Sequence, residues 1–121
     1  MVTRLTKGRL KVTISETRAE LGEVAAREVG AYIRSLLETQ PEVNIIFASA
    51  PSQNDFLANL LLEEIDWSRV NAFHMDEYIG IDPHAPQAFG QFLRDRIFSK
   101  KTFKSVNYID PKAADPAAEC E

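Results

Sequence analysis

Two short segments of the chain carry side chains that could do chemistry. In the first, Phe73 to Tyr78, the acids Asp76 and Glu77 directly follow an apolar run. Adjacent residues of an extended chain point to opposite faces, so the two carboxylates are not expected to act as a pair. One of them could face a cleft as a general base. Since most acids at strand ends are structural or solvated, position alone favours a solvated or turn-capping acid.

The second segment, Ala48 to Gln53, carries the hydroxyls of Ser49 and Ser52 between an apolar run and a helical pattern. A helix N-terminus presents free N–H groups and the positive end of the helix dipole, so a phosphate could bind there. Ser52 followed by Asp55 also fits a capping box, which is common and needs no ligand. The spacing leaves both interpretations open.

The histidines and the cysteine give no metal signature. His74 lies inside an expected strand, where an imidazole is usually a hydrogen-bonded core group. His84 and Asp82 share a proline-bounded loop, but two ligands are too few to indicate a metal site. The single cysteine, Cys120, excludes a disulfide framework and a cysteine metal cluster within these residues.

Patterns typical of strands and helices alternate along the chain. This alternation predicts a parallel sheet with helices on both faces, a Rossmann-like α/β fold forming a single domain over residues 1–121. In such sheets ligands bind at the carboxyl ends of the strands, where both chemical segments lie. Strands are expected over Leu10–Ile14, Val43–Ala48, Val70–Met75 and Val106–Ile109, and helices after Thr17, after Ser52 and around Pro86.

Charge and hydropathy limit the classes of partner. The formal net charge of -4 disfavours binding to a nucleic-acid backbone. The longest apolar stretch, Ile45 to Ala48, is far too short to span a bilayer, and no secretory signal is visible. We therefore expect no nucleic-acid and no membrane partner, and a cytoplasmic location.

The last residues predict a helix that the chain does not complete. Asp115 and Pro116 form a helix start, and the chain stops about one turn later. One turn of helix is unstable alone, so either this terminus is frayed or the chain is a part cut from a longer protein. Half a sheet exposes an apolar edge and face, which predicts self-association, as a homo-oligomer, or recruitment of a partner.

One segment resembles a known family. Asn71-Ala-Phe-His-Met-Asp-Glu-Tyr-Ile-Gly-Ile81 is similar to the Asn-Met-Asp-Glu-Tyr-Val-Gly-Leu signature of glucosamine-6-phosphate deaminases. The family's His-x-Pro-Gln segment follows at a similar distance as His84 to Gln87. Ala48 to Gln53 falls where the family carries a Thr-Gly-Gly-Thr phosphate loop. The related 6-phosphogluconolactonases usually have Asp-Glu-Arg, so Tyr78 favours the deaminase side.

The resemblance implies isomerisation and deamination of an aminosugar phosphate to a ketose phosphate and ammonia. It implies that Asp76 takes the proton from C2, with Glu77 and Tyr78 as supporting residues. It implies a small sugar phosphate as substrate, with no metal and no organic cofactor. The loop that it implies for the substrate phosphate consists of Ser49, Ala50, Pro51 and Ser52.

The sequence departs from the family pattern in two ways. Ala50-Pro51 replaces the double glycine, and because proline has no N–H one phosphate donor is lost, which leaves the exact sugar open. The family's ring-opening histidine and basic phosphate ligands belong to later segments that this chain lacks. We therefore expect the N-terminal half of the enzyme, inactive alone. The alternatives are a 6-phosphogluconolactonase-like hydrolase and a non-catalytic sugar-phosphate-binding module.

Overall fold

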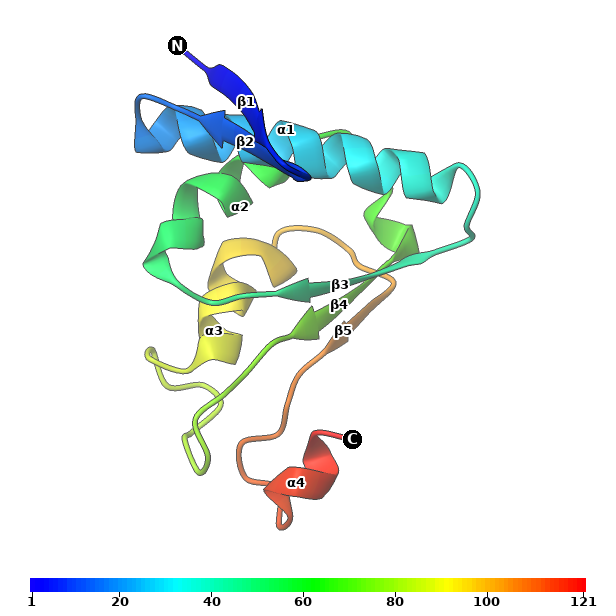
Figure 1. Ribbon diagram of the computed structural model, residues 1–121. Helices are drawn as coiled ribbons and strands as arrows, with labels where there is room; N and C mark the ends of the chain where they lie inside the picture. The colour runs from blue at the N-terminus through cyan, green and yellow to red at the C-terminus, as the bar shows by residue number, and fades with distance from the viewer.

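The computed structural model describes all residues from Met1 to Glu121. Its centre is a parallel sheet of three strands in the order β3-β4-β5 (Figure 1). Val43 pairs with Val70 and Asn71 with Ser105, so all three carboxyl ends reach the same edge. The prediction of an α/β fold with a parallel sheet is confirmed. The strands are β3 (Val43–Phe47), β4 (Val70–His74) and β5 (Ser105–Asn107).

The N-terminal strand prediction needs a correction. Leu10–Ile14 is a strand, β2, but it pairs with β1 (Thr3–Lys7) in a separate antiparallel hairpin rather than joining the parallel sheet. Gly8 lies in the two-residue turn with a φ of 62°, a backbone conformation that residues other than glycine rarely adopt. Each residue of β2 pairs with a residue of β1, from Leu10 with Lys7 to Ile14 with Thr3, so β2 belongs to this local hairpin.

Helix α1 (Arg18–Leu37) begins at the predicted cap. The Thr17 hydroxyl accepts a hydrogen bond from Glu20 N at 3.1 Å, and the Glu20 carboxylate accepts one from Glu16 N at 2.8 Å. Helix α2 (Asn54–Leu60) packs against α1. The predicted capping box at Ser52 does not form, because a 3₁₀ turn over Pro51–Gln53 precedes α2. Asp55 instead pairs with Arg18, whose Nε lies 2.7 Å from Oδ2.

The third helix starts later than predicted. Helix α3 (Phe89–Leu93) begins three residues after Pro86 and continues as a π-helical turn over Arg94–Phe98. A 3₁₀ turn over Trp67–Arg69 leads into β4. The predicted helix start near the C-terminus is present as α4 (Pro116–Glu119), where Asp115 accepts hydrogen bonds from Ala117 N and Ala118 N. None of the helices combines the length and the apolar character needed to cross a membrane.

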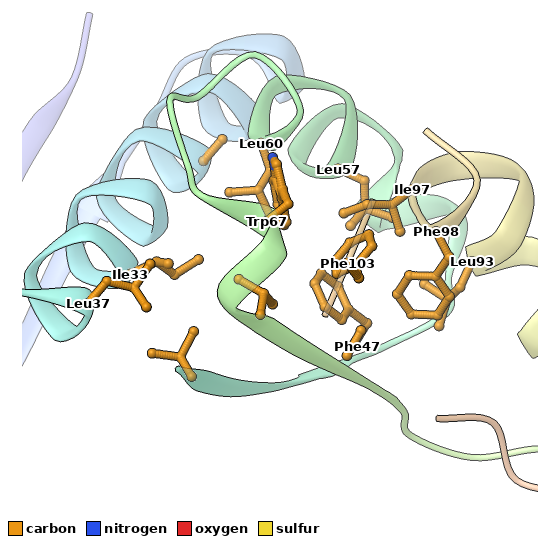
Figure 2. Close-up of a cluster of buried hydrophobic side chains, with 14 residues drawn as sticks. Ile33, Leu37, Phe47, Leu57, Leu60, Trp67, Leu93, Ile97, Phe98 and Phe103 are labelled. Atoms are coloured by element: carbon orange, nitrogen blue, oxygen red, sulfur yellow. The ribbon is translucent and has the colours of Figure 1, made fainter. Parts of the chain in front are cut away.

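The core lies between one face of the sheet and the first three helices. Aromatic rings fill its centre, with Phe47 and Phe98 meeting edge to face at 5.4 Å between ring centroids (Figure 2). Burial of this apolar area is the main force that holds the helices on the sheet. Its members are Ala26, Ile33, Leu37, Val43, Phe47, Leu57, Leu60, Trp67, Val70, Ala72, Leu93, Ile97, Phe98 and Phe103.

The prediction of helices on both faces is only partly correct. Helices α1 to α3 pack against the face of the sheet that carries Val43, Phe47, Val70 and Ala72. On the opposite face of β3, Ile46 is 65% exposed, and the single turn of α4 is the only helix on that side of the sheet (Figure 1). The apolar run of β3 resembled a strand buried on both faces, but here only alternate residues meet a helix layer.

Candidate functional site

The two chemical segments leave neighbouring strands at the same edge of the sheet. Ala48 to Gln53 follows β3, and Met75 to Tyr78 follows β4. Met75 N donates a hydrogen bond to Phe47 O at 3.2 Å, which extends the pairing just beyond the strand ends. The parallel register therefore places both segments at the position where open α/β sheets bind ligands.

Glu77 is the most constrained acid of this edge. Its side chain is only 3% exposed and accepts three backbone hydrogen bonds. Phe89 N and Gly90 N donate at 2.9 Å each, and Tyr78 N donates at 3.1 Å. Ala88, at the cap position of α3, has no side-chain oxygen to offer. Glu77 thus caps α3 from a distant part of the chain and satisfies N–H groups that the helix leaves open.

His74 lies beside Glu77 in the interior. Its Nδ1 accepts a hydrogen bond from Ile109 N at 3.2 Å, so the proton of the neutral ring is on Nε2. Nε2 lies 3.4 Å from Glu77 Oε2, close enough for a charge contact, but no atom meets hydrogen-bond geometry with it. The prediction of a hydrogen-bonded core histidine is confirmed through Nδ1.

Burial and backbone donors set the protonation of this pair. Burial lowers the pKa of His74 below its ordinary 6.5, although Glu77 and Asp76 act in the opposite direction. Burial alone raises the pKa of Glu77, but the N–H donors of Gly90, Phe89 and Tyr78 outweigh it, and the pKa lies below its ordinary 4.5. At neutral pH the pair is a neutral imidazole beside a carboxylate.

These two shifts predict a stability that declines in acid. The unfolded chain takes up a proton on His74 below about pH 6.5 that the folded chain resists, so this contribution is full above 6.5 and is lost as the pH falls toward the folded pKa. Glu77 adds a second loss of stability when the pH falls below 4.5, the ordinary pKa of its carboxyl group. We expect the urea concentration at the midpoint of unfolding to be lower at about pH 5.5 than at about pH 7.5.

His74→Asn is expected to flatten this pH dependence, because it removes the imidazole that titrates. The Asn oxygen can replace Nδ1 as acceptor for Ile109 N, so the variant keeps that hydrogen bond. The exposed His84→Asn is the matched control, since it keeps His74 in place. An equal slope in wild type and His74→Asn would contradict the assignment.

Asp76 is exposed, in contrast to its neighbour. It lines a cavity of about 240 Å³ at the rim of which α4 lies, together with Tyr78, Asp110 and Glu119. The ring of Tyr78 rests on that of Phe89 at 4.7 Å between centroids. The two adjacent carboxylates therefore have different surroundings, as the alternation of an extended chain predicts. A solvent-facing carboxylate in a cavity can exchange a proton with a bound molecule.

The predicted phosphate loop is fixed at one end and open at the other. The Ser49 hydroxyl donates to Phe89 O at 3.1 Å, while the N–H groups of Ser49 and Ala50 donate to no protein acceptor. Pro51 has no N–H, and its carbonyl accepts from the Arg18 guanidinium. Ser52 faces α1 and lines a separate cavity of about 370 Å³ that also contains Arg18.

The two segments share a neighbour but not a cavity. Ser49 contacts the first residue of α3, and Glu77 contacts the same residue from the other side. Asp76 and Ser52 line different cavities. Asp82, weighed as a metal ligand with His84, accepts from the backbone N of His84 at 2.9 Å, which is a local turn contact.

Sequence reasoning missed Arg18 and the start of α3. Arg18 connects α1 to the loop through Pro51 O and Asp55. The N–H groups of Phe89 and Gly90 fix Glu77, and a Cβ at Gly90 would lie 3.2 Å from the Tyr108 ring and 3.4 Å from Glu77 Oε2. The only sequence signal for this contact was that Ala88, before α3, has no side chain able to cap the helix. That signal did not identify Glu77 as the residue that caps it.

The largest groove, of about 690 Å³, lies on the open face of the sheet. It is lined by alternate residues of the strands, such as Asn44, Ile46 and Phe73, and by the last residues of the chain. Its lining contains neither Asp76 nor the loop after β3. Met75, Ile109, Glu119 and Cys120 line both this groove and the cavity of Asp76, so the groove adjoins the strand-end site.

The sequence is similar to those of known enzymes, although no family model matches the chain. A glucosamine-6-phosphate deaminase of Listeria monocytogenes is 31% identical over 83 residues, which are 68% of this chain and 36% of the relative. A glucosamine-6-phosphate deaminase of Lactobacillus delbrueckii subsp. bulgaricus is 24% identical over 111 residues, which are 92% of this chain and 45% of the relative.

Solved structures share the fold. A monomeric glucosamine-6-phosphate deaminase of the NagB superfamily superposes with a TM-score of 0.74 at 22% identity, over 88% of this chain and 45% of the other. A 6-phosphogluconolactonase of Thermotoga maritima gives a TM-score of 0.73 at 17% identity, over 82% and 45%.

The chain has the α/β fold that these deaminases and lactonases share. Among proteins of this fold, the matching sequences confirm the resemblance to the glucosamine-6-phosphate deaminases. The chain spans less than half the length of the curated relatives it matches.

Proposed function

We propose that residues 1–121 form the N-terminal half, a single α/β domain, of a glucosamine-6-phosphate deaminase. The full protein converts an aminosugar phosphate to a ketose phosphate and ammonia. The observation that carries the proposal is the placement of Asp76, exposed in a cavity at the end of β4, beside an acid that is buried and fixed. The sequence similarity to deaminases over most of the chain supports it.

Asp76 is the general base of this proposal. Isomerisation removes the proton from C2 of the open-chain sugar and returns a proton at C1, and one carboxylate can do both. Protonation at C1 leaves an imine at C2, and water hydrolyses this imine to the ketone and ammonia. Glu77 and Tyr78 support Asp76 from the same turn. No metal or organic cofactor takes part in this scheme.

The loop of Ser49, Ala50, Pro51 and Ser52 receives the phosphate. The free N–H groups of Ser49 and Ala50 are the donors, and the first helical turn behind them favours an anion. Pro51 contributes none. The acids around Asp76, including Asp110 and Glu119, disfavour phosphate in that cavity, so the phosphate belongs at the loop and the reacting carbons belong near Asp76.

The chain alone is expected to bind a sugar phosphate weakly and to release no ammonia. Members of a catalytic set act as a unit, and this chain spans less than half the length of the relatives it matches, which indicates a partial set. Addition of glucosamine 6-phosphate up to about 10 mM should shift the NMR amide signals of Ser49, Ala50 and Ser52, as expected for millimolar affinity. Glucosamine without phosphate is the control ligand.

Two results would contradict this scheme. Absence of any shift at the loop amides would reject the phosphate site. Ammonia release from glucosamine 6-phosphate that disappears in Asp76→Asn would disprove inactivity of the chain alone, while supporting Asp76 as base.

A lactonase remains the second candidate, because 6-phosphogluconolactonases superpose about as well as the deaminase. It predicts hydrolysis of 6-phosphogluconolactone with acid release and no ammonia from any aminosugar phosphate. A non-catalytic sugar-phosphate-binding module would bind both the aminosugar phosphate and the lactone and convert neither.

The cytoplasm is the proposed location. The exposed Ile46 face supports a homo-oligomer or a covering partner, and sedimentation across concentrations tests this.

A further inference from the structure

Two contacts converge on the first residue of α3 from the two halves of the strand-end site. From the β4 side, the Glu77 carboxylate accepts from Phe89 N at 2.9 Å. From the β3 side, the Ser49 hydroxyl donates to Phe89 O at 3.1 Å. The peptide group between Phe89 and Gly90 contacts both sides, because Gly90 N donates to Glu77 at 2.9 Å and Phe89 O accepts from Ser49, so it links the Asp76 turn with the loop of Ser49 to Ser52.

Glu77 is the better fixed of the two links. The carboxylate is nearly fully buried and uses both oxygens, Oε1 for Phe89 and Tyr78 and Oε2 for Gly90. Charge-assisted hydrogen bonds to backbone N–H groups are about twice as strong as neutral ones. The bond to Tyr78 N holds the backbone immediately after Asp76, so it restricts the direction in which the Asp76 side chain leaves the chain.

We infer that Glu77 is a positioning residue that fixes both halves of the strand-end site on α3, setting the direction of Asp76 directly and the place of the loop through Phe89 and Ser49. This inference rests on the proposed function for its meaning in catalysis. The mechanical link itself is independent of any substrate. A carboxylate that only capped α3 would affect that helix and leave the loop after β3 unchanged.

Glu77→Gln tests the link with little change of size. The amide of Gln has one acceptor oxygen and an NH₂ group that can only donate, so at least one of the three backbone N–H groups faces another donor. We expect ¹⁵N order parameters of Ser49, Ala50, Ser52, Asp76 and Tyr78 to fall from the rigid range, about 0.85, to below about 0.6. Ser49→Ala should produce the fall in the loop alone.

Glu23→Gln is the matched control, because it makes the same change at an exposed carboxylate that pairs with Arg27 on the surface of α1, and the loop order parameters should stay unchanged. If Glu77→Gln does not fold, Glu77→Asp keeps the charge but is shorter by one methylene, and the same falls are expected. Unchanged loop order parameters in the folded variant would overturn the inference and leave Glu77 as a plain cap.

Binding of glucosamine 6-phosphate gives the second measurement. We expect the Kd to rise about tenfold in Glu77→Gln, equivalent to the loss of one good hydrogen bond, and less than twofold in Glu23→Gln. A tight-binding Glu77→Gln variant would overturn the role in the site. If the wild-type chain binds no sugar phosphate, the proposed function fails, and the order parameters still decide whether Glu77 fixes the two segments.

Discussion

Phe103→Ala is expected to lower the free energy of unfolding by about 3–4 kcal/mol, the range for a buried Phe truncated in a core. The Phe103 ring lies between three others, with centroids 5.0 Å from Trp67, 5.5 Å from Phe98 and 6.4 Å from Phe47 (Figure 2). Truncation removes the contacts on all three sides and leaves a cavity that the stiff rings cannot close.

The same substitution should reach the site through β5. The next residue, Lys104, donates its N–H to Trp67 O and Val70 O, which places the start of β5 against β4. If this junction loosens, the segment after β5 also becomes less fixed, and its Ile109 N donates the hydrogen bond to His74 Nδ1. Urea unfolding monitored by far-ultraviolet circular dichroism measures the loss, and Phe103→Leu should lose less than about 1.5 kcal/mol because most of the volume remains.

Leu62→Ala is the control for Phe103→Ala. Leu62 is 81% exposed, so its truncation should change the stability by less than about 0.5 kcal/mol. A Phe103→Ala variant as stable as Leu62→Ala would show that the aromatic cluster is not the centre of the core.

Gly22→Ala is expected to destabilise the protein by about 2 kcal/mol, the opposite of the usual effect in a helix. Alanine normally gains about 1 kcal/mol over glycine within a helix. At Gly22, however, an added Cβ would lie 2.6 Å from Asp55 Cβ and 2.8 Å from the Asp55 carbonyl carbon. Because backbone cannot swing aside, α2 must move away from α1, and overpacking of this kind costs about 1–3 kcal/mol.

Gly30→Ala is the matched control on the same helix. A Cβ there would meet Glu63 Cγ and Oε2 at 2.9 Å each, which are atoms of a flexible side chain that can turn away. We expect a change within about 0.5 kcal/mol. Equal effects at Gly22 and Gly30 would contradict the close approach of α1 to α2. A shift of α2 would also move Asp55 and its partner Arg18 at the loop.

Local patterns were sufficient for much of the fold. The cap at Thr17, the strand patterns of β3 and β4 and the helix start at Asp115 all appear where the residues predicted them. Each depends on contacts within a few residues, and such contacts are written in the sequence spacing. The predictions at Ser52 and Pro86 were wrong, because a 3₁₀ turn and a distant carboxylate determined where those helices begin.

The sequence by itself determined the strand-end position of Asp76, the composition of the loop from Ser49 to Ser52 and the similarity to deaminases, because these are properties of order and spacing. Only the tertiary structure decided that β2 leaves the sheet for a hairpin, that one sheet face stays open, and that Glu77 is buried while Asp76 is exposed. The physical reason is that these outcomes depend on partners far along the chain. Phe89 and Gly90 are 12 and 13 residues from Glu77, and no local pattern marks them as its donors.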